Sequence, residues 1–139
     1  MKHKKPLALI LSFIMALTLS IPVMAQEGNI PDKIIILHTN DVHCGIDDNI
    51  GYAGLVSCKA QMEQVYGREN VTLVDAGDAI QGGAIGTLSD GAFPVDIMNQ
   101  AGYDIAVPGN HEFDYGMDNF LRLAEERAEY TYVCSNFID

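Results

Sequence analysis

Positive charge is scarce in this sequence. Its 139 residues include eight Lys and Arg against 19 Asp and Glu. Binding to nucleic acid through the phosphates needs clustered basic side chains, so this composition argues against that class of function. So many carboxylates need either solvent around them or cations between some of them. We therefore expect no nucleic-acid partner, and the composition is compatible with cation binding.

Cysteine is also scarce. Cys44, Cys58 and Cys134 are widely and irregularly spaced and form no C-x-x-C pair, so a structural zinc site is not supported. We expect Cys58 and Cys134 to be ordinary buried small side chains, and Cys44 to be a packing residue of its loop rather than a metal ligand. Export would permit a disulfide, but the spacing does not indicate a pair.

The sequence lacks an apolar run long enough to span a bilayer, which needs roughly 20 residues. The run over residues 7–21 is shorter, follows a basic head and precedes the small-residue pattern Val-Met-Ala at 23–25. This is typical of a secretory signal peptide cleaved between Ala25 and Gln26, rather than of a membrane anchor. Residue 26 is also not the cysteine that lipid attachment would need. We therefore expect export, with periplasm, cell wall and extracellular medium all open.

Residues 26–139 are expected to form one domain, with neither internal repeats nor low-complexity segments. Without Lys2, Lys4 and Lys5, five of the eight basic residues remain against 19 acidic ones, a net charge of −14. Apolar runs alternate with segments of helical periodicity. Strands are expected over 33–40, 70–78, 103–110 and 131–137, and helices over 52–67, 93–102 and 116–130. This βαβαβαβ order predicts an α/β fold with a mainly parallel sheet covered on both faces.

Two of the expected helices have a recognisable apolar stripe. In the helix over 52–67, which should stop at Gly67, the stripe consists of Tyr52, Leu55, Val56, Met62 and Tyr66. In the helix over 116–130 it consists of Met117, Phe120, Leu121, Ala124 and Ala128. Such stripes are expected to pack against the sheet.

Polar clusters follow three consecutive expected strands. Asp41 and His43 follow the first, Asp78 follows the second, and the segment "GNHEFD" over 109–114 follows the third. The carboxyl ends of parallel strands share one edge of a sheet, where ligand sites collect. Carboxylate, imidazole and amide oxygen ligands suit cations such as Zn²⁺ and Mn²⁺. Each cluster alone has an ordinary structural explanation, and Asp75 is interpreted as a hydrogen-bonding partner; the conjunction of the three favours a metal site.

The segments "ILHTNDVH", "DAGDAIQG" and "GNHEFDYG", in this order, resemble the amino-terminal half of the metallophosphatase domain of secreted 5′-nucleotidases. UDP-sugar hydrolases and 2′,3′-cyclic-nucleotide phosphodiesterases share these motifs, within the calcineurin-like metallophosphoesterases. The resemblance runs from about Lys33 to the end of the chain. It implies a four-layer α/β/β/α sandwich of which residues 26–139 supply one half, as a partial domain.

The resemblance also implies two divalent metal ions, Zn²⁺, Mn²⁺ or similar. Asp41 and His43 would hold the first ion, Asp78 would bridge both, and Asn110 would bind the second. The further histidines that complete both shells in the family lie in motifs downstream of this sequence, as does the domain that grips the nucleotide.

For catalysis, the resemblance implies that His111, oriented by Asp114, stabilises charge on the phosphoryl group or assists the leaving oxygen. The implied reaction is attack of a metal-bound hydroxide on the phosphorus of a nucleotide or another phosphoester. We interpret the sequence as a fragment of such an enzyme. Two alternatives stay open: an inactive or weakly metal-binding remnant, and the same metal core acting on cyclic nucleotides, UDP-sugars or sulfur esters.

Overall fold

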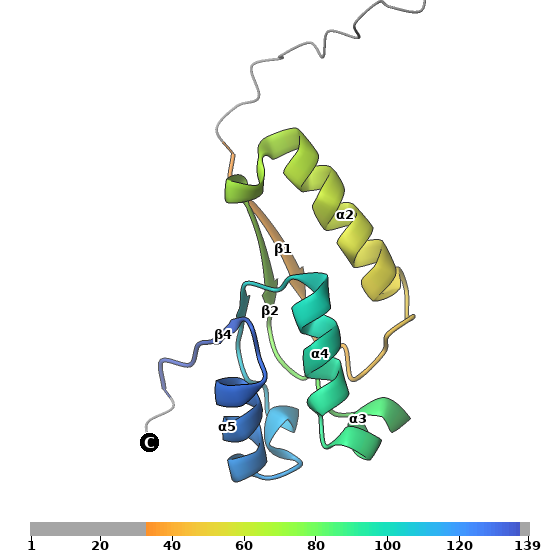
Figure 1. The fold of residues 1–139 in the computed structure, drawn as a ribbon, viewed down its shortest axis with the longest axis vertical. Coiled ribbons are helices and arrows are strands. Elements are labelled where there is room, and N and C mark those ends of the chain that lie inside the picture. Colours follow the sequence, from red (N-terminus) through yellow and green to blue (C-terminus); the bar gives the residue numbers. More distant parts are fainter. Residues whose placement is uncertain (1–32, 137–139) are drawn as a thin grey trace, which may run out of the picture.

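The computed structural model describes residues 33–136. The predicted signal peptide and its cleavage site between Ala25 and Gln26 lie outside the described residues. Four strands form one sheet in the order β1-β2-β3-β4, and every neighbouring pair is parallel (Figure 1). The strands are β1 (Ile35–Thr39), β2 (Val71–Asp75), β3 (Ile105–Ala106) and β4 (Thr131–Tyr132). The predicted α/β fold with a parallel sheet is confirmed, although β3 and β4 are shorter than the segments that were expected.

Helices connect the strands. They are α2 (Gly51–Tyr66), α3 (Ala84–Ser89), α4 (Ala92–Ala101) and α5 (Met117–Glu126), with short 3-10 turns η1 (Arg68–Asn70) and η2 (His111–Phe113). Crossovers between parallel strands are right-handed, so a sheet built in sequential order receives its helices on one face. Figure 1 shows α2 and α4 lying alongside the sheet. Helix α3 was not predicted, because its six residues lie in a segment interrupted by glycines.

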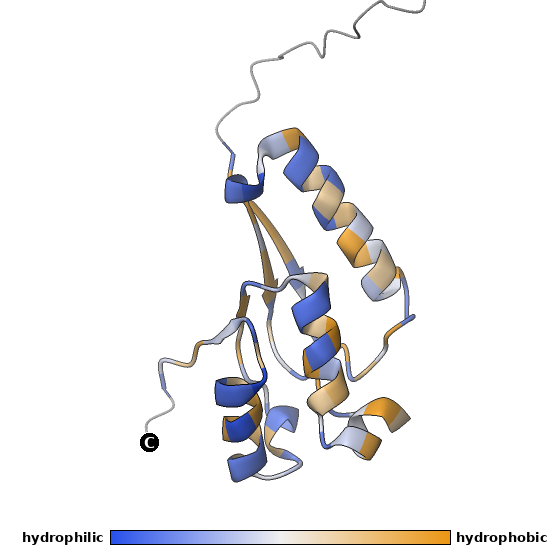
Figure 2. Cartoon of the chain, in the orientation of Figure 1, coloured by the Kyte–Doolittle hydropathy of each residue, from blue (hydrophilic) through white to orange (hydrophobic). Residues whose placement is uncertain are grey.

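The core lies between the sheet and these helices. Leu73 of β2, Val95 and Met98 of α4, Ala106 of β3 and Leu123 of α5 are all 0% exposed. Figure 2 shows that β1 and β2 are largely hydrophobic along their length, whereas the helices carry hydrophilic stretches. Successive side chains of a strand point to opposite faces of the sheet. Half of the side chains of these apolar strands therefore pack into this core.

The opposite face of the sheet is open within residues 33–136. Its apolar side chains include Ile36, which is 64% exposed, and Ile105, Val107 and Val133, which are 36%, 40% and 44% exposed. We predicted that the sheet would be covered on both faces. Within the described residues, only the face that packs against the helices is covered.

Two predicted helical stripes need correction. In α2, Tyr52 and Leu55 are buried as expected, but Val56 is 41% exposed and Lys59 is buried instead. The buried positions Tyr52, Leu55 and Lys59 follow a spacing of three and four residues. Lys59 tolerates burial because its Nζ lies 3.1 Å from Glu63 Oε1, one turn further along.

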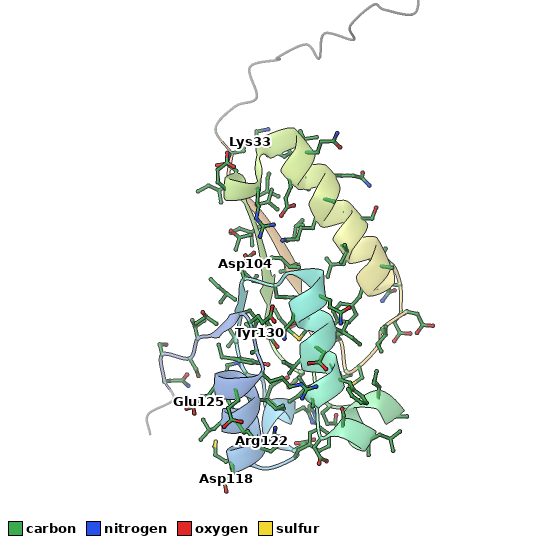
Figure 3. The ribbon with its side chains drawn as sticks, in the orientation of Figure 1. Lys33, Asp104, Asp118, Arg122, Glu125 and Tyr130 are labelled. Carbon is green, nitrogen blue, oxygen red and sulfur yellow. The ribbon has the colours of Figure 1, made fainter. Side chains whose placement is uncertain are left out.

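In α5, Phe120 and Leu123 are buried, whereas Met117 at the first position is 42% exposed. Asp118, Arg122 and Glu125 lie on the outward side of this helix (Figure 3). The helix is therefore amphipathic as predicted, with its buried stripe displaced from Met117 toward Leu123.

All three cysteines are free thiols in this structure. Cys44 is buried, as expected of a packing residue, but Cys58 and Cys134 are half-buried rather than buried. Within residues 33–136, no helix has the length and apolar character required to cross a membrane.

Candidate metal centre

The loops that follow β1 and β2 run side by side at the carboxyl edge of the sheet. Backbone N–H groups of the first loop donate to carbonyl oxygens of the second: Asp41 to Gly77 over 3.0 Å, and His43 to Asp78 over 2.9 Å. Cys44 N–H donates to Ala79 O over 3.1 Å. These bonds extend the pairing of the two strands beyond their ends, so the predicted polar clusters of the two loops come together.

Three side chains at this edge could hold a metal ion. His43, Asp78 and His111 each offer one ligand atom, and these atoms lie within 4.8 Å of one another. The imidazole rings of His43 and His111 are edge to face, with centroids 5.1 Å apart. Asp41 Oδ1 lies 3.8 Å from His43 Nε2, which places a second carboxylate beside the cluster. Imidazole and carboxylate donors fit Zn²⁺ or Mn²⁺.

In both His43 and His111, one ring nitrogen is hydrogen-bonded to a neighbouring residue. His43 Nδ1 lies 3.1 Å from the carbonyl oxygen of Gln81, and His111 Nδ1 lies 2.8 Å from Asp114 Oδ2. Such partners fix the ring orientation and the tautomer of a metal-binding or catalytic histidine. The hydrogen bond to Asp114 raises the pKa of His111 above its usual value. The predicted contact between His111 and Asp114 is therefore present.

The backbone adopts uncommon conformations at the same residues. Asp41, His43 and Asp78 have φ angles of 52°, 47° and 60°, in the left-handed region. Each such conformation costs a residue with a side chain roughly 1–2 kcal/mol. Strain of this kind collects at binding and catalytic sites, where surrounding contacts hold it in place. The backbone of these three polar residues is therefore strained at the positions where the loops direct their side chains toward a common point.

Asp78 is held to the third loop by its side chain. His111 N–H donates to Asp78 Oδ1 over 2.8 Å, so the backbone of one loop orients the carboxylate of another. The approach is close enough that Gly109 has no room for a side chain, since a Cβ there would lie 2.8 Å from Asp78 N. Gly77, with φ of 104°, is limited in the same way by Gly109 N at 2.7 Å.

Glu112 is the residue of this region that sequence reasoning missed. Its side chain is 1% exposed, and it accepts hydrogen bonds from the backbone N–H groups of Asp78, Ala79 and Gly109. The available signal was its position inside "GNHEFD", between two residues with predicted roles. A single acidic residue in a loop is more often solvated, and nothing in the sequence shows that two other loops would close over it.

Asp75, at the end of β2, is a hydrogen-bonding partner as predicted. Its carboxylate accepts from Thr39 Oγ1 over 2.6 Å and from Gly77 N over 2.9 Å, and the Thr39 hydroxyl also contacts the Tyr103 hydroxyl at 2.8 Å. The side chain is 3% exposed, and burial raises its pKa to about 6. Asp75 thus supports the loop behind Asp78 without entering the cluster.

Asn110, the fourth predicted ligand, directly precedes the 3-10 turn η2, which starts at His111. It is exposed. Its position on the third loop agrees with the predicted location, and its role as a ligand stays a prediction. A cavity of about 420 Å³ adjoins Asp41, between the end of β1 and the start of α2.

The sequence pattern of one family matches nearly all of the described chain. The matched family is the calcineurin-like phosphoesterases, and the match covers residues 34–139. The chain belongs to the calcineurin-like phosphoesterase family. Three side chains that could hold a metal ion therefore lie at the carboxyl edge of a parallel sheet, in a chain of the calcineurin-like phosphoesterase family.

Several proteins similar to this chain are named as nucleotidases. The chain is 31% identical to the 5′-nucleotidase of Homo sapiens over 116 residues, and 30% identical to the snake venom 5′-nucleotidase of Gloydius brevicauda over 115 residues; each match covers 75% of this chain and 20% of the other protein. Among solved structures, the NAD nucleotidase NadN of Haemophilus influenzae is similar with a TM-score of 0.64 and 27% identity. That similarity covers 74% of this chain and 20% of NadN.

This phosphoesterase chain therefore spans about a fifth of the length of the relatives named here. The three loops lie within residues 34–139, which the family match covers. The similarity to the named relatives covers about three quarters of this chain. It does not extend to the remaining four fifths of those proteins.

Proposed function

We propose that the full-length protein is an exported, dinuclear-metal phosphoesterase that hydrolyses nucleotides in the manner of a 5′-nucleotidase. The observation that carries this proposal is the convergence of His43, Asp78 and His111 within 4.8 Å, in a chain of the calcineurin-like phosphoesterase family. Similarity to two proteins named 5′-nucleotidase supports the substrate class.

In this proposal, Asp41 and His43 hold the first divalent cation, Asp78 is shared by both cations, and Asn110 belongs to the second. When bound, the cations neutralise charge on the phosphate oxygens and make a nucleophile available near neutral pH. The other ligands of the second cation come from elsewhere in the full-length protein, as does the part that binds the nucleoside.

The residues of this chain orient the reacting groups. His111 N–H fixes the direction of the Asp78 carboxylate, so that this side chain is in place before substrate binds. Asp114 accepts from His111 Nδ1, which leaves Nε2 as the nitrogen that can reach substrate. The hydrogen bond to Asp114 raises the pKa of His111. A charged imidazole stabilises the negative charge that develops on the phosphoryl group.

Export is proposed on the signal-peptide pattern of residues 1–25, and the occurrence of a related 5′-nucleotidase in snake venom supports it. Expression of the full-length protein followed by N-terminal sequencing of the secreted form tests this part. We expect the mature protein to begin at Gln26. Retention of the intact N-terminus inside the cell would contradict this expectation.

The activity is tested with the full-length protein and a panel of AMP, a cyclic nucleotide, a UDP-sugar and NAD in the presence of Mn²⁺. We expect phosphate release from AMP that stops in EDTA and returns when Mn²⁺ is added in excess. The NAD arm is included because the similar structure NadN is named as an NAD nucleotidase. Activity that is indifferent to EDTA contradicts the metal-dependent reaction; preference for another member of the panel contradicts the proposed substrate.

A further inference from the structure

Glu112 is a buried carboxylate with backbone partners. Its side chain is 1% exposed, and the ion pairs found among residues 33–136 do not include it. A buried carboxylate is costly unless hydrogen bonds satisfy its oxygens. Four backbone N–H groups do so: Oε2 accepts from Asp78 over 2.8 Å and Gly109 over 2.6 Å, and Oε1 accepts from Ala79 over 2.8 Å and Ile80 over 3.4 Å.

These donors belong to two different loops. Asp78, Ala79 and Ile80 follow β2, whereas Gly109 follows β3 and directly precedes Asn110. Oε2 alone contacts both loops, because Asp78 N and Gly109 N converge on it. One carboxylate oxygen thereby joins the loop that carries the proposed bridging ligand to the loop that carries the proposed ligand of the second cation.

The carboxylate also stabilises a strained turn. Asp78 has a φ of 60°, a conformation unfavourable for a residue with a side chain. Consecutive N–H groups around such a residue form a concave site for an anion. The oxygens of Glu112 occupy that position beneath Asp78–Ile80. Loss of the anion would leave these N–H groups without an acceptor, which destabilises the turn.

A third contact orients the side chain of Asp78. His111, adjacent to Glu112 in the chain, donates its N–H to Asp78 Oδ1 over 2.8 Å. The glutamate thus holds the backbone of Asp78 while its neighbour holds the carboxylate of Asp78. If the two loops separate, both contacts are lost together, and the Asp78 carboxylate loses its fixed direction toward His43 and His111.

We propose that Glu112 is a positioning residue that sets the separation of the Asp78 loop and the Gly109–His111 loop, and through it the affinity for divalent cations. This rests on the proposed function, since it assumes that Asp78 binds metal. Glu112 itself takes no part in the reaction and touches neither metal nor substrate.

The test compares Glu112→Gln with wild type in the full-length protein, by calorimetry with Mn²⁺ and by the visible absorption of bound Co²⁺, which reports ligand geometry. Glutamine keeps the size of the side chain but turns one acceptor into a donor that faces backbone N–H groups. We expect the Kd for Mn²⁺ to rise about tenfold or more, as for other residues that support metal ligands, together with an altered Co²⁺ spectrum. Glu126→Gln, an exposed substitution on α5, is the matched control and should leave both unchanged.

A second variant, Glu112→Asp, keeps both acceptor oxygens but withdraws them by about 1.5 Å, one carbon–carbon bond. An intermediate loss of Mn²⁺ affinity is expected, with partial recovery of the Co²⁺ spectrum relative to Glu112→Gln. A role in folding alone would lower the thermal midpoint of the metal-free protein and leave Kd and the spectrum as in wild type. That result in any folded variant overturns the proposal.

If both variants fail to fold in saturating Mn²⁺, Glu112 is a residue of the fold and the proposal is also overturned. Failure of the proposed function is distinguishable from both results. If the proposed function is wrong, the wild-type protein neither binds Mn²⁺ nor releases phosphate. If only the positioning role is wrong, the wild-type protein is active and the Glu112 variants bind Mn²⁺ as tightly as it does.

Discussion

The two faces of the sheet are both apolar but differ in how deeply their side chains are buried. On the helix side, Leu73 and Ala106 are 0% exposed and pack in a continuous core with α4 and α5. On the open side, Ile36 and Val133 are apolar and yet 64% and 44% exposed within the described residues. One face of the sheet therefore has its packing partners within this chain. The other face has the apolar composition of a core face, but no described residues cover it. The chain spans about a fifth of the length of its named relatives.

The largest difference is expected when the same truncation is made on both faces. Leu73→Ala removes a side chain that is 0% exposed and should lower the free energy of unfolding by about 2–5 kcal/mol. Ile36→Ala, on the next strand but the open face, should cost less than about 1 kcal/mol, because most of its surface is already in water. Urea unfolding of the 139-residue chain measures both. Equal losses would contradict the difference between the faces.

The helix side also carries a buried acid whose charge should make stability depend on pH. Burial raises the pKa of Asp75 to about 6, above the value of roughly 3.9 in an unfolded chain. The protonated form is favoured in the folded state, so its contribution is complete below pH 4 and is lost as pH rises through 6. For a shift of this size the change is on the order of 2–3 kcal/mol.

Unfolding measured at several pH values, in wild type and in Asp75→Asn, isolates this contribution. We expect the wild type to lose more stability than the variant between about pH 4 and pH 7. The amide can still accept from Gly77 N–H, so the variant should remain folded. Parallel pH profiles for the two proteins would show that Asp75 is not the group responsible.

At the edge of the sheet, Gly109→Ala should disturb the site more than the fold. The added methyl would lie 2.8 Å from Asp78 N and against the Asp78 carboxylate, so that carboxylate must shift. Overpacking of this kind costs about 1–3 kcal/mol, and the affinity for Mn²⁺ should fall about tenfold. Calorimetry and thermal unfolding on the same preparation separate the two effects. Unchanged Mn²⁺ affinity would mean that the Asp78 carboxylate has more freedom than its contacts indicate.

The smallest effect is expected for Ile36→Thr, which keeps a β-branched side chain on the open face. In the 139-residue chain the change in unfolding free energy should stay within about 0.5 kcal/mol. In the full-length protein, cover over this face would raise the cost to about 1–2 kcal/mol. A neutral result in both proteins would indicate that Ile36 stays exposed in the complete molecule.

Much of the fold could be predicted because alternation of apolar runs and helical periodicity is a local signal. The strand ends at Thr39 and Asp75 carry the predicted polar clusters directly after them. Helix faces were less predictable: Lys59 is buried because Glu63 pairs with it, and a stripe based on hydrophobicity cannot include a lysine. Helix α3 is six residues long and rests on tertiary contacts rather than on a pattern of its own.

The candidate site divides in the same way. Asp41, His43 and Asp78 stand at strand ends, where a parallel sheet brings them together whatever the details of the loops. Glu112 could not be found in this way, because its role depends on N–H groups more than 30 residues away, at Asp78 and Ala79. A residue that joins loops is visible only once those loops are placed.

Whether the three loops hold two metal ions can be tested by diffraction from crystals of the full-length protein soaked in Zn²⁺, with anomalous data at the zinc edge. We expect a metal ion bound by His43, Asp41 and Asp78 at about 2.0–2.2 Å, and a second ion that shares Asp78 and lies against Asn110. Metal peaks remote from these side chains, or none at a zinc concentration that supports activity, would contradict this expectation.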